Sequence, residues 1–191
     1  MSPRRGLDTD TILHTAIIIA NKEGLESVTI ASLAKELNVK PPSLYNHIQS
    51  LNSLKRLIAL QGLEKLTQAL IQSIHQLKGE EAILSMCSTY VEFARNHPGL
   101  YEATLTAPDG QDLELQGAGE KLLGVVMDIL SEVGLEGITA LHATRSLRSM
   151  LHGFVSLEQK GGFGLPLQLN ETLSYMVQVF LIGIQSEKRV R

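Results

Sequence analysis

Apolar residues recur at helical spacing along almost the whole chain, and this periodicity limits the possible folds more than any other feature. Near the N-terminus, Ile12, Ala16, Ile19 and Ala20 form one such stripe. No stretch sustains, for more than a few residues, the alternation of apolar and polar side chains that marks a half-buried strand. The sequence therefore predicts an all-α fold.

Composition favours a soluble globular protein in a reducing compartment. Hydrophobic residues make up 43% of the 191 residues and charged residues 19%. The single cysteine, Cys87, excludes an internal disulfide and suits a small buried residue. Residues 2–11 are polar, and the apolar run at 16–20 is far shorter than the roughly 20 residues of a membrane span. We therefore expect a cytoplasmic protein without a membrane partner.

The net charge of −3 conceals an asymmetry between the start of the chain and the rest. Residues 1–60 contain seven basic and five acidic side chains, a net +2, which leaves −5 for the remainder. A mildly basic start on an acidic body is compatible with a nucleic-acid contact confined to the N-terminal part.

The first fifty residues predict three short helices and the positions at which they begin and end. Gly24 suits the end of the first helix, and Thr29 can cap a second, two-turn helix. Asn38 tolerates the left-handed backbone of a tight turn. The adjacent Pro41 and Pro42 suit the first turn of a third helix, where a missing N–H costs nothing. A longer fourth helix begins near Ser50 or Ser53.

This spacing is that of a helix-turn-helix, in which the first residues of the last helix reach base edges and nearby polar groups hold phosphates. Tyr45 and His47 each also suit a structural role, as a half-buried tyrosine and an ordinary surface histidine. Together with their neighbours after an Asn-containing turn they favour DNA binding. The proline rings suit a thymine methyl group, and an asparagine can bind adenine through two hydrogen bonds. The candidate DNA contacts in this segment are Lys40, Pro41, Pro42, Ser43, Tyr45, Asn46 and His47.

Residues Thr11–Leu60 resemble the DNA-binding domain of the tetracycline-repressor (TetR) family of bacterial regulators. The resemblance is carried above all by "LAKELNV" and "SLYNHI". It implies that Pro41, Pro42, Ser43 and Asn46 face bases, and that Thr29, Tyr45 and His47 hold phosphates.

Two positions depart from the family pattern. Asn38 stands where glycine is usual, and Leu51 stands where a phosphate-binding lysine is often found. Lys55, or an arm carrying Arg4 and Arg5, is a candidate replacement for that lysine contact; a solvated tail is the alternative for the arm.

Longer helices follow beyond residue 78, and the last of them suits a start capped by Asn170. "FARNHPGLY" and the segment from "SLRSMLHGF" to "LIGI" resemble regulatory domains of the same family. The resemblance implies a homodimer in which the last two helices of each subunit form a four-helix bundle. We expect these helices to carry more apolar surface than one chain needs, and the candidate interface residues are Leu147, Leu151, Val177, Phe180, Leu181 and Ile184.

The resemblance also implies a small-molecule effector bound among the C-terminal helices. Residues 1–52 are then the DNA-binding domain, and residues 53–191 the ligand-binding and dimerisation domain. An ordinary core role is an equal alternative for each candidate lining residue, namely Met86, Tyr90, Phe93, Tyr101, Leu105, Met127 and Phe154.

The sequence favours a ligand-responsive regulator, acting as a repressor on a palindromic double-stranded DNA operator, over two rivals. These are a helical ligand-binding protein or enzyme without DNA binding, and a sequence-blind DNA-packaging protein. No nucleophile elbow, paired carboxylates or cofactor fingerprint is present, so we expect neither an enzyme nor a cofactor. His142, Arg145, Ser149 and His152 share a helical face, which suits a polar stripe better than ligand contacts or a metal site.

Overall fold

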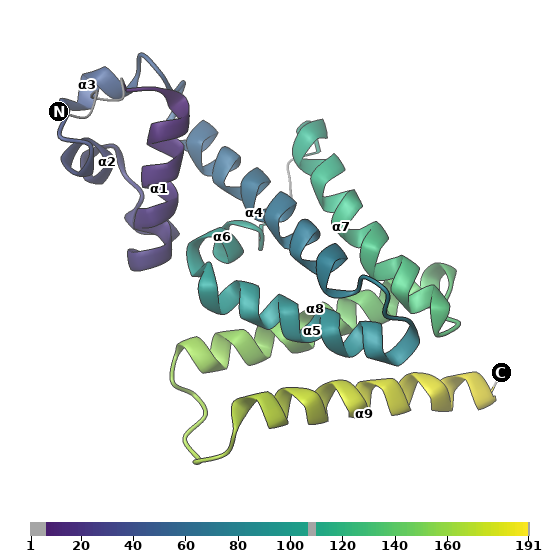
Figure 1. Cartoon of the computed structure of the whole chain (residues 1–191). Helices are drawn as coiled ribbons and strands as arrows, with labels where there is room; N and C mark the ends of the chain where they lie inside the picture. The colour runs from purple at the N-terminus through teal and green to yellow at the C-terminus, as the bar shows by residue number, and fades with distance from the viewer. Residues whose placement is uncertain (1–6, 107–109, 191) are drawn as a thin grey trace. The chain divides into compact units, whose positions relative to one another are not determined.

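The computed structural model describes residues 7–106 and 110–190, with side chains up to Ile184. Within these ranges the regular elements are all helices, which confirms the predicted fold class (Figure 1). In chain order they are α1 (Thr9–Glu23), the 3₁₀ turn η1 (Leu25–Ser27), α2 (Ile30–Glu36), α3 (Pro41–Leu44), α4 (Leu51–Ser73), α5 (Gly79–Asn96), α6 (Pro98–Ala103), α7 (Leu113–Glu132), α8 (Gly137–Gln159) and α9 (Leu169–Val190).

The chain forms two compact units. The N-terminal unit contains the residues up to Lys65 together with His97–Gly119, and the C-terminal unit contains Leu66–Asn96 and the residues from Glu120 onward. The N-terminal unit therefore takes in α6 and the first part of α7, besides the helices near the start of the chain. The predicted functional boundary at residues 52/53 is a different kind of division and stays a prediction.

Helix α1 forms where the sequence predicts it and buries the predicted face. Asp8 caps its first turn, because the Asp8 carboxylate accepts a hydrogen bond from the Thr11 N–H at 2.7 Å. Its apolar stripe of Ile12, Ala16, Ile19 and Ala20 is buried. Gly24 ends the helix with a φ of 89°, a value that glycine adopts without strain.

Helix α6 is fastened to the C-terminal end of α1 by backbone contact and by two polar side chains. The N–H groups of Gly99 and Leu100 donate to Asn21 Oδ1 at 2.9 and 3.3 Å. On the other side, the Leu25 N–H of η1 donates to a Glu102 carboxylate oxygen at 2.8 Å. These bonds satisfy backbone donors at the start of α6 and in η1 that helix geometry leaves unpaired. Helices α1, η1 and α6 are therefore one packed assembly.

A close backbone approach makes glycine necessary at position 99. A Cβ atom built on Gly99 would lie 2.3 Å from the carbonyl carbon of Ala20 and 2.5 Å from the Ala20 Cβ. No side chain fits at such a separation, because the obstructing atoms belong to the helix backbone and cannot rotate away. The Pro98-Gly99 pair thus combines a helix-starting proline with a glycine that lets α6 touch α1.

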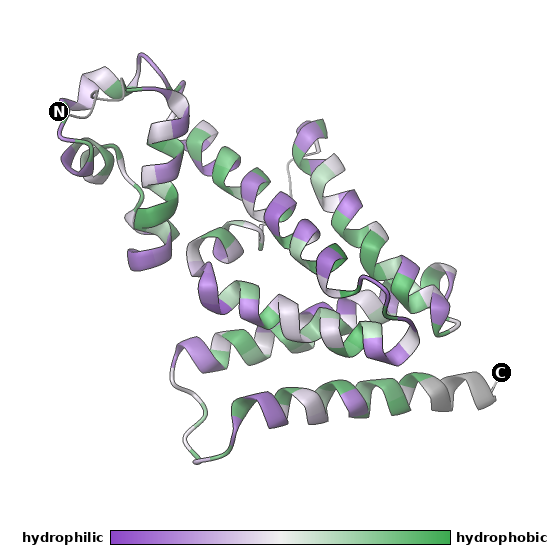
Figure 2. Ribbon diagram, in the orientation of Figure 1, coloured by the Kyte–Doolittle hydropathy of each residue, from purple (hydrophilic) through white to green (hydrophobic). Residues whose placement is uncertain are grey.

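The C-terminal unit is built from amphipathic helices, with α8 and α9 packed on α5. Hydrophobic residues follow helical faces in Figure 2, and the buried ones include Ile83, Val91 and Phe154. At one end, the Arg95 guanidinium of α5 contacts Glu158 of α8 at 2.8 Å and the Asn170 side chain at 2.9 Å. A single arginine therefore joins the ends of three helices.

The start of α9 differs from the sequence-based prediction. The helix begins at Leu169, and Asn170 lies inside its first turn, so it is not the cap. The Asn170 side-chain oxygen accepts from Arg95, a residue that is distant in sequence. The connector before α9 is irregular, as predicted. The centroid of its Phe163 ring lies 5.2 Å from the centroid of the Phe154 ring.

Cys87 is fully buried in α5, in agreement with the sequence-based interpretation. Burial raises the pKa of its thiol to about 12, because the apolar surroundings disfavour the thiolate. Over the residues that the structure describes, no helix is both long enough and apolar enough to cross a membrane.

The close contact at Gly99 leads to a stability prediction. Gly99→Ala should lower the free energy of unfolding by about 1–3 kcal/mol, the usual cost of overpacking, because the new methyl group overlaps the Ala20 backbone. Urea unfolding followed by circular dichroism measures this change.

Gly117→Ala is the matched control, since a Cβ at Gly117 would meet nothing within 4 Å. Gly117 lies inside α7, so alanine there should raise stability by about 0.5–1 kcal/mol. Equal effects of the two substitutions would contradict the close-approach interpretation.

Candidate nucleic-acid interface

The predicted recognition segment forms a short helix that is held by two buried side chains. Pro41 and Pro42 occupy the first turn of α3, as predicted, and Lys40 precedes them with extended backbone. The helical turn continues to Ile48, whose N–H donates to the Leu44 carbonyl at 3.0 Å. Leu44 and Ile48 are buried, at 0% and 5% exposure, which confirms that they share the inner face.

The turn between α2 and α3 has the conformation that the sequence predicts. Asn38 has a φ of 52°, in the left-handed region. The Val39 N–H donates to the Ala34 carbonyl at 2.9 Å, which is the main bond of a Schellman motif ending α2. Asparagine therefore takes the role of the glycine that is usual at this position.

Thr29 caps α2, as predicted, and Ser32 completes a reciprocal capping box. The Ser32 N–H donates to Thr29 Oγ1 at 3.0 Å, and the Thr29 N–H donates to Ser32 Oγ at 2.9 Å. The Ser32 hydroxyl also donates to the Ser27 carbonyl at 2.8 Å. Ser32 was not among the predicted residues, although a polar residue three positions after a threonine cap is a recognisable signal.

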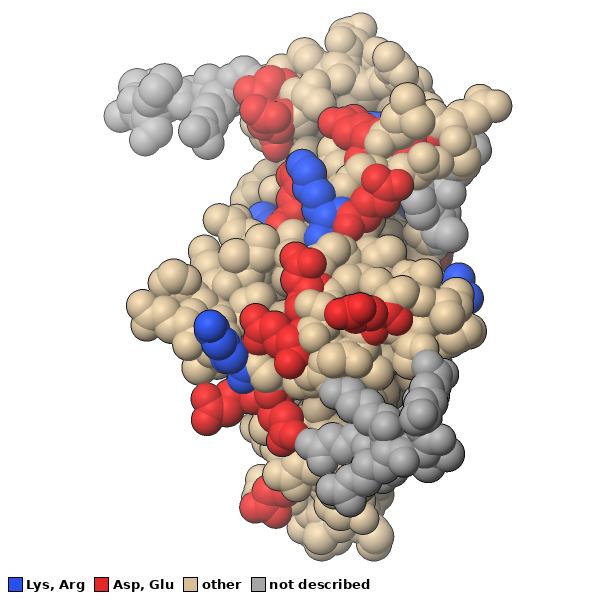
Figure 3. Space-filling model, turned by 90° about the vertical axis from the view of Figure 1, so that its right-hand side faces the viewer, with Lys and Arg blue, Asp and Glu red and all other residues tan. Residues whose placement is uncertain are grey.

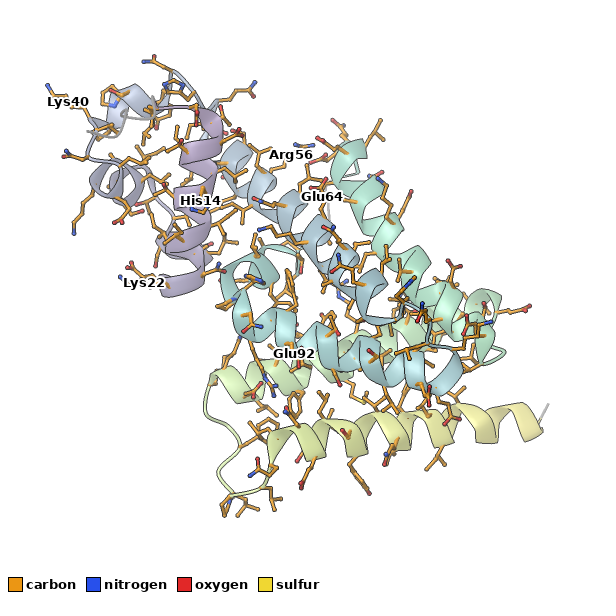
Figure 4. The ribbon with its side chains drawn as sticks, viewed as in Figure 1. His14, Lys22, Lys40, Arg56, Glu64 and Glu92 are labelled. Atoms are coloured by element: carbon orange, nitrogen blue, oxygen red, sulfur yellow. The ribbon has the colours of Figure 1, made fainter. Side chains whose placement is uncertain are left out.

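The side chains predicted to contact DNA are on the outer side of α3. Tyr45 is 57% exposed, which argues against the alternative of a half-buried core tyrosine. The outward side of the segment further includes Lys40, Pro41, Pro42, Asn46 and His47, which are exposed, and Ser43, which is half-buried. Figure 4 shows Lys40 at the outer edge of α3, at the opposite end of α1 from Lys22. The Thr9 hydroxyl ties the start of α1 to this segment by donating to the His47 carbonyl at 3.0 Å.

The structure describes Leu51 and one of the candidates for replacing the missing lysine contact. Leu51 is the first residue of α4 and is half-buried. The Lys55 ammonium lies 2.9 Å from a Glu26 carboxylate oxygen, so this charge is paired inside the N-terminal unit. The remaining candidates, Arg4 and Arg5, lie outside the described residues. Whether any of these residues contacts DNA stays a prediction.

The N-terminal unit also contains an ion cluster that was not predicted from the sequence. Arg56, next to Lys55, holds Asp112 and Glu114 at the start of α7. Hydrogen bonding to Asp112 and then Glu114 raises the pKa of Arg56, and the bond from Arg56 lowers the pKa of Asp112. Sequence offers no signal for these pairs, because the partners are more than fifty positions apart.

The predicted effector-lining residues are divided between the two units. Tyr101, which is buried, and Leu105, which is half-buried, belong to the N-terminal unit. In the C-terminal unit Met86, Phe93 and Phe154 are buried, and Tyr90 and Met127 are half-buried. The Met127 sulfur lies 3.7 Å from the Thr144 hydroxyl. A ligand-binding role for these residues stays a prediction.

Most of the predicted dimer residues belong to the protomer's own core. Leu147, Leu151, Val177, Leu181 and Ile184 are all buried in the single chain, and Phe180 is half-buried. Helix α5 packs against both α8 and α9 and helps to bury them within one chain. A role of these six residues in a dimer interface stays a prediction. Among the described side chains, the large apolar ones that remain exposed on α8 and α9 are Ile138, Leu141, Leu157, Tyr175, Val179 and Ile182.

The histidine-bearing stripe of α8 lies mainly at the surface. His142, Arg145 and Ser149 are exposed, and His152 is half-buried. Among the residues that the structure describes, no group of three histidine, cysteine or acidic side chains is placed to hold a metal ion. On the face shown in Figure 3 acidic side chains outnumber basic ones, in line with the net negative charge of the chain.

Comparison with known proteins identifies the class to which this fold and helix-turn-helix belong, namely bacterial transcriptional regulators. The chain is 40% identical over 185 residues to the HTH-type transcriptional regulator YobS of Bacillus subtilis (strain 168), an alignment that covers 96% of each protein. Residues 83–180 match the family model described as tetracyclin repressor-like, C-terminal domain. The chain therefore belongs to the TetR family of transcriptional regulators, which confirms the predicted family. The relatives are regulators and not enzymes, as the sequence predicted for this chain.

Solved structures show the same fold at low sequence identity. The TetR-family regulator PfmR from Thermus thermophilus has a TM-score of 0.68 at 17% identity, covering 93% of this chain and 97% of that protein. The TetR-Q116A protein of Acinetobacter baumannii AYE, solved in complex with minocycline, has a TM-score of 0.61 at 18% identity, covering 94% and 97%.

Proposed function

We propose that this regulator is a homodimeric repressor that binds a palindromic DNA operator through α3 and is released by a small-molecule effector. The observation that carries the proposal is the two-sided character of the α3 segment. Its inner face is anchored by Leu44 and Ile48, while Tyr45, Asn46 and His47 stand exposed without a core role. Such a helix presents hydrogen-bonding groups that the fold itself does not use.

The proposed contacts follow from what each exposed group offers. Asn46 has the donor and acceptor pair that reads adenine, and the rings of Pro41 and Pro42 offer apolar surface to a thymine methyl group. Tyr45, His47 and Lys40 supply donors for phosphate oxygens, and Thr29 lies at the N-terminus of α2, where helix geometry favours an anion. Phosphate contacts then fix the register, and the base contacts specify the sequence.

A homodimer is supported by the exposed apolar face of α9. Tyr175, Val179 and Ile182 are exposed by 67%, 50% and 63%, and their spacing puts them on one side of the helix. A second copy of the chain would cover this face, and a two-fold dimer matches the symmetry of a palindromic operator. The proposed interface is therefore centred on these exposed residues, and the predicted residues Phe180, Leu181 and Ile184 lie on the same helix.

An effector is supported by the family and by the chemistry of the C-terminal unit. The predicted lining residues there, among them Met86, Phe93 and Met127, carry no charge, which favours a largely apolar ligand. The A. baumannii structure contains minocycline, so the same fold can hold a small molecule. The proposed release is a shift of population toward a dimer whose recognition helices no longer match the operator half-sites. Because the target is chromosomal DNA, the proposed function also requires a cytoplasmic location.

The central test is a gel-shift titration against the DNA upstream of the chain's own gene, with Tyr45→Phe/His47→Ala as the variant. The wild type should retard this DNA and not a scrambled duplex. The variant should bind at least about tenfold more weakly through the loss of phosphate contacts, while its melting temperature stays within about 2 °C because both side chains are exposed.

Each alternative gives a different result in that titration. Absence of retardation by the wild type would favour a ligand-binding protein without DNA binding, and equal retardation of both duplexes would favour a packaging protein. A variant that unfolds would show that Tyr45 and His47 have structural roles.

Asn46→Ala tests base reading separately from phosphate binding. Loss of the amide should cost on the order of 1–3 kcal/mol at one operator position, and so relax the preference for that base. Binding to a set of operators that vary one position at a time measures this. An equal loss of affinity on every duplex would assign Asn46 to the backbone instead.

Ile182→Glu tests the proposed dimer face. Because the side chain is exposed in the protomer, the subunit should stay folded, while an unpaired charge in the interface should weaken dimerisation by on the order of 3 kcal/mol, or more than about 100-fold. Sedimentation equilibrium measures the dimer constant. Ile71→Glu makes the same change at an isoleucine of α4 that is 50% exposed, and it should leave the dimer intact. An unchanged dimer constant in the Ile182→Glu variant would exclude this face.

A further inference from the structure

Arg56 on α4 holds the first turn of α7 through two carboxylates. Its Nη2 donates to Asp112 Oδ1 at 2.7 Å and to Glu114 Oε2 at 2.8 Å, and its Nε donates to the second Asp112 oxygen. Arginine and carboxylate therefore meet through two parallel hydrogen bonds, the strongest geometry for such a pair. In Figure 4 the labelled Arg56 lies between α4 and the start of α7.

Asp112 has a second role at the same place, because it also caps α7. Its Oδ1 accepts from the Leu115 N–H at 3.1 Å, and its carbonyl accepts from the Gln116 N–H at 2.9 Å. A carboxylate at a helix N-terminus is further favoured by the helix dipole. The position of Arg56 therefore fixes where α7 begins, through the residue that starts the helix.

The neighbouring cation of α4 points to a different partner. Lys55 pairs with Glu26 of η1, so two consecutive residues of one helix hold segments on two sides. Single ion pairs in contact with solvent contribute little to stability, and the pair between Lys55 and Glu26 is of this kind, because the Glu26 side chain is 89% exposed. The Arg56 and Asp112 side chains are only 34% and 17% exposed, so their pair is better shielded from solvent.

Arg56 also lies close in sequence to the recognition segment. It is on the second turn of α4, a helix that starts at Leu51 after a reciprocal bond pair between Ser50 and Ser53. The chain from Ile48 to Arg56 is therefore ordered by α4 and its cap. This stretch of chain is the covalent connection between α3 and Arg56.

We propose that Arg56 is a positioning residue that couples the recognition helix to the first turn of α7 through Asp112. This inference rests on the proposed DNA binding, and it names the contact through which a change in α7 would reach α3. Because coupling between two sites is reciprocal, DNA that binds better when Arg56 holds the start of α7 must in turn stabilise the start of α7. Operator DNA can therefore serve as the probe, without knowledge of the effector.

The experiment is hydrogen exchange of the full-length protein with and without a duplex of its own upstream DNA. In the wild type, DNA should slow exchange in the α3 segment and also slow exchange of the Leu115 and Gln116 amides, the latter on the order of tenfold. In Arg56→Gln the slowing at Leu115 and Gln116 should fall below about twofold, while the slowing at α3 remains.

Three further variants separate coupling from simple loss of structure. Asp112→Asn keeps a side chain that can cap α7 and removes the charge that Arg56 binds, so it should behave like Arg56→Gln. Arg56→Lys keeps the charge without the paired hydrogen bonds and should restore part of the effect. Lys65→Gln removes an exposed cation farther along α4, away from the start of α7, and should leave the slowing at α7 unchanged.

The outcomes distinguish this inference from the proposed function. DNA-induced slowing at α7 that survives in Arg56→Gln, or that is absent in the wild type while α3 is protected, would overturn the coupling role of Arg56. Absence of both α3 protection and a gel shift in the wild type would instead overturn the proposed DNA binding. Loss of α7 slowing in Arg56→Gln and Asp112→Asn alone, with α3 protection kept throughout, would establish the coupling.

Discussion

The proposed DNA-reading surface of this regulator depends on the packing of two buried side chains, Leu44 and Ile48, which hold helix α3 in place. Helix α3 is only four residues long, far below the length at which a helix is stable by itself in water. Its conformation is therefore imposed by the two anchors, by the prolines that start it and by the Asn38 turn that precedes it. Once these are fixed, the outward side chains of the segment are available to an external partner.

The N-terminal unit extends this anchoring well beyond the helix-turn-helix. Helix α6 is held on α1 by the Gly99 contact and by Asn21, and the start of α7 is held on α4 by Arg56. Residues from the middle of the chain are thus structural parts of the unit that carries the proposed recognition helix. In the proposed function, a change at α6 or at the start of α7 would therefore act on the same unit as α3.

Local features of the fold were predictable from the sequence because their causes are local. The buried stripe of α1, the threonine cap of α2, the left-handed Asn38 and the prolines at the start of α3 each depend on residues within a few positions. The start of α9 was not predictable, since Asn170 resembles a cap but binds Arg95 instead. The dimer face shows a related limit: apolar periodicity indicates that a face is buried, but not whether the same chain or a second copy covers it.

The sequence by itself determined the all-α class, the family and the local form of the helix-turn-helix, because helical periodicity, caps and turn residues act over short distances. Only the tertiary structure decided which carboxylate each cation of α4 holds, that Gly99 must be glycine, and which apolar side chains of α9 stay exposed. Those outcomes depend on residues separated by tens of positions, and their contacts exist only after the helices have packed.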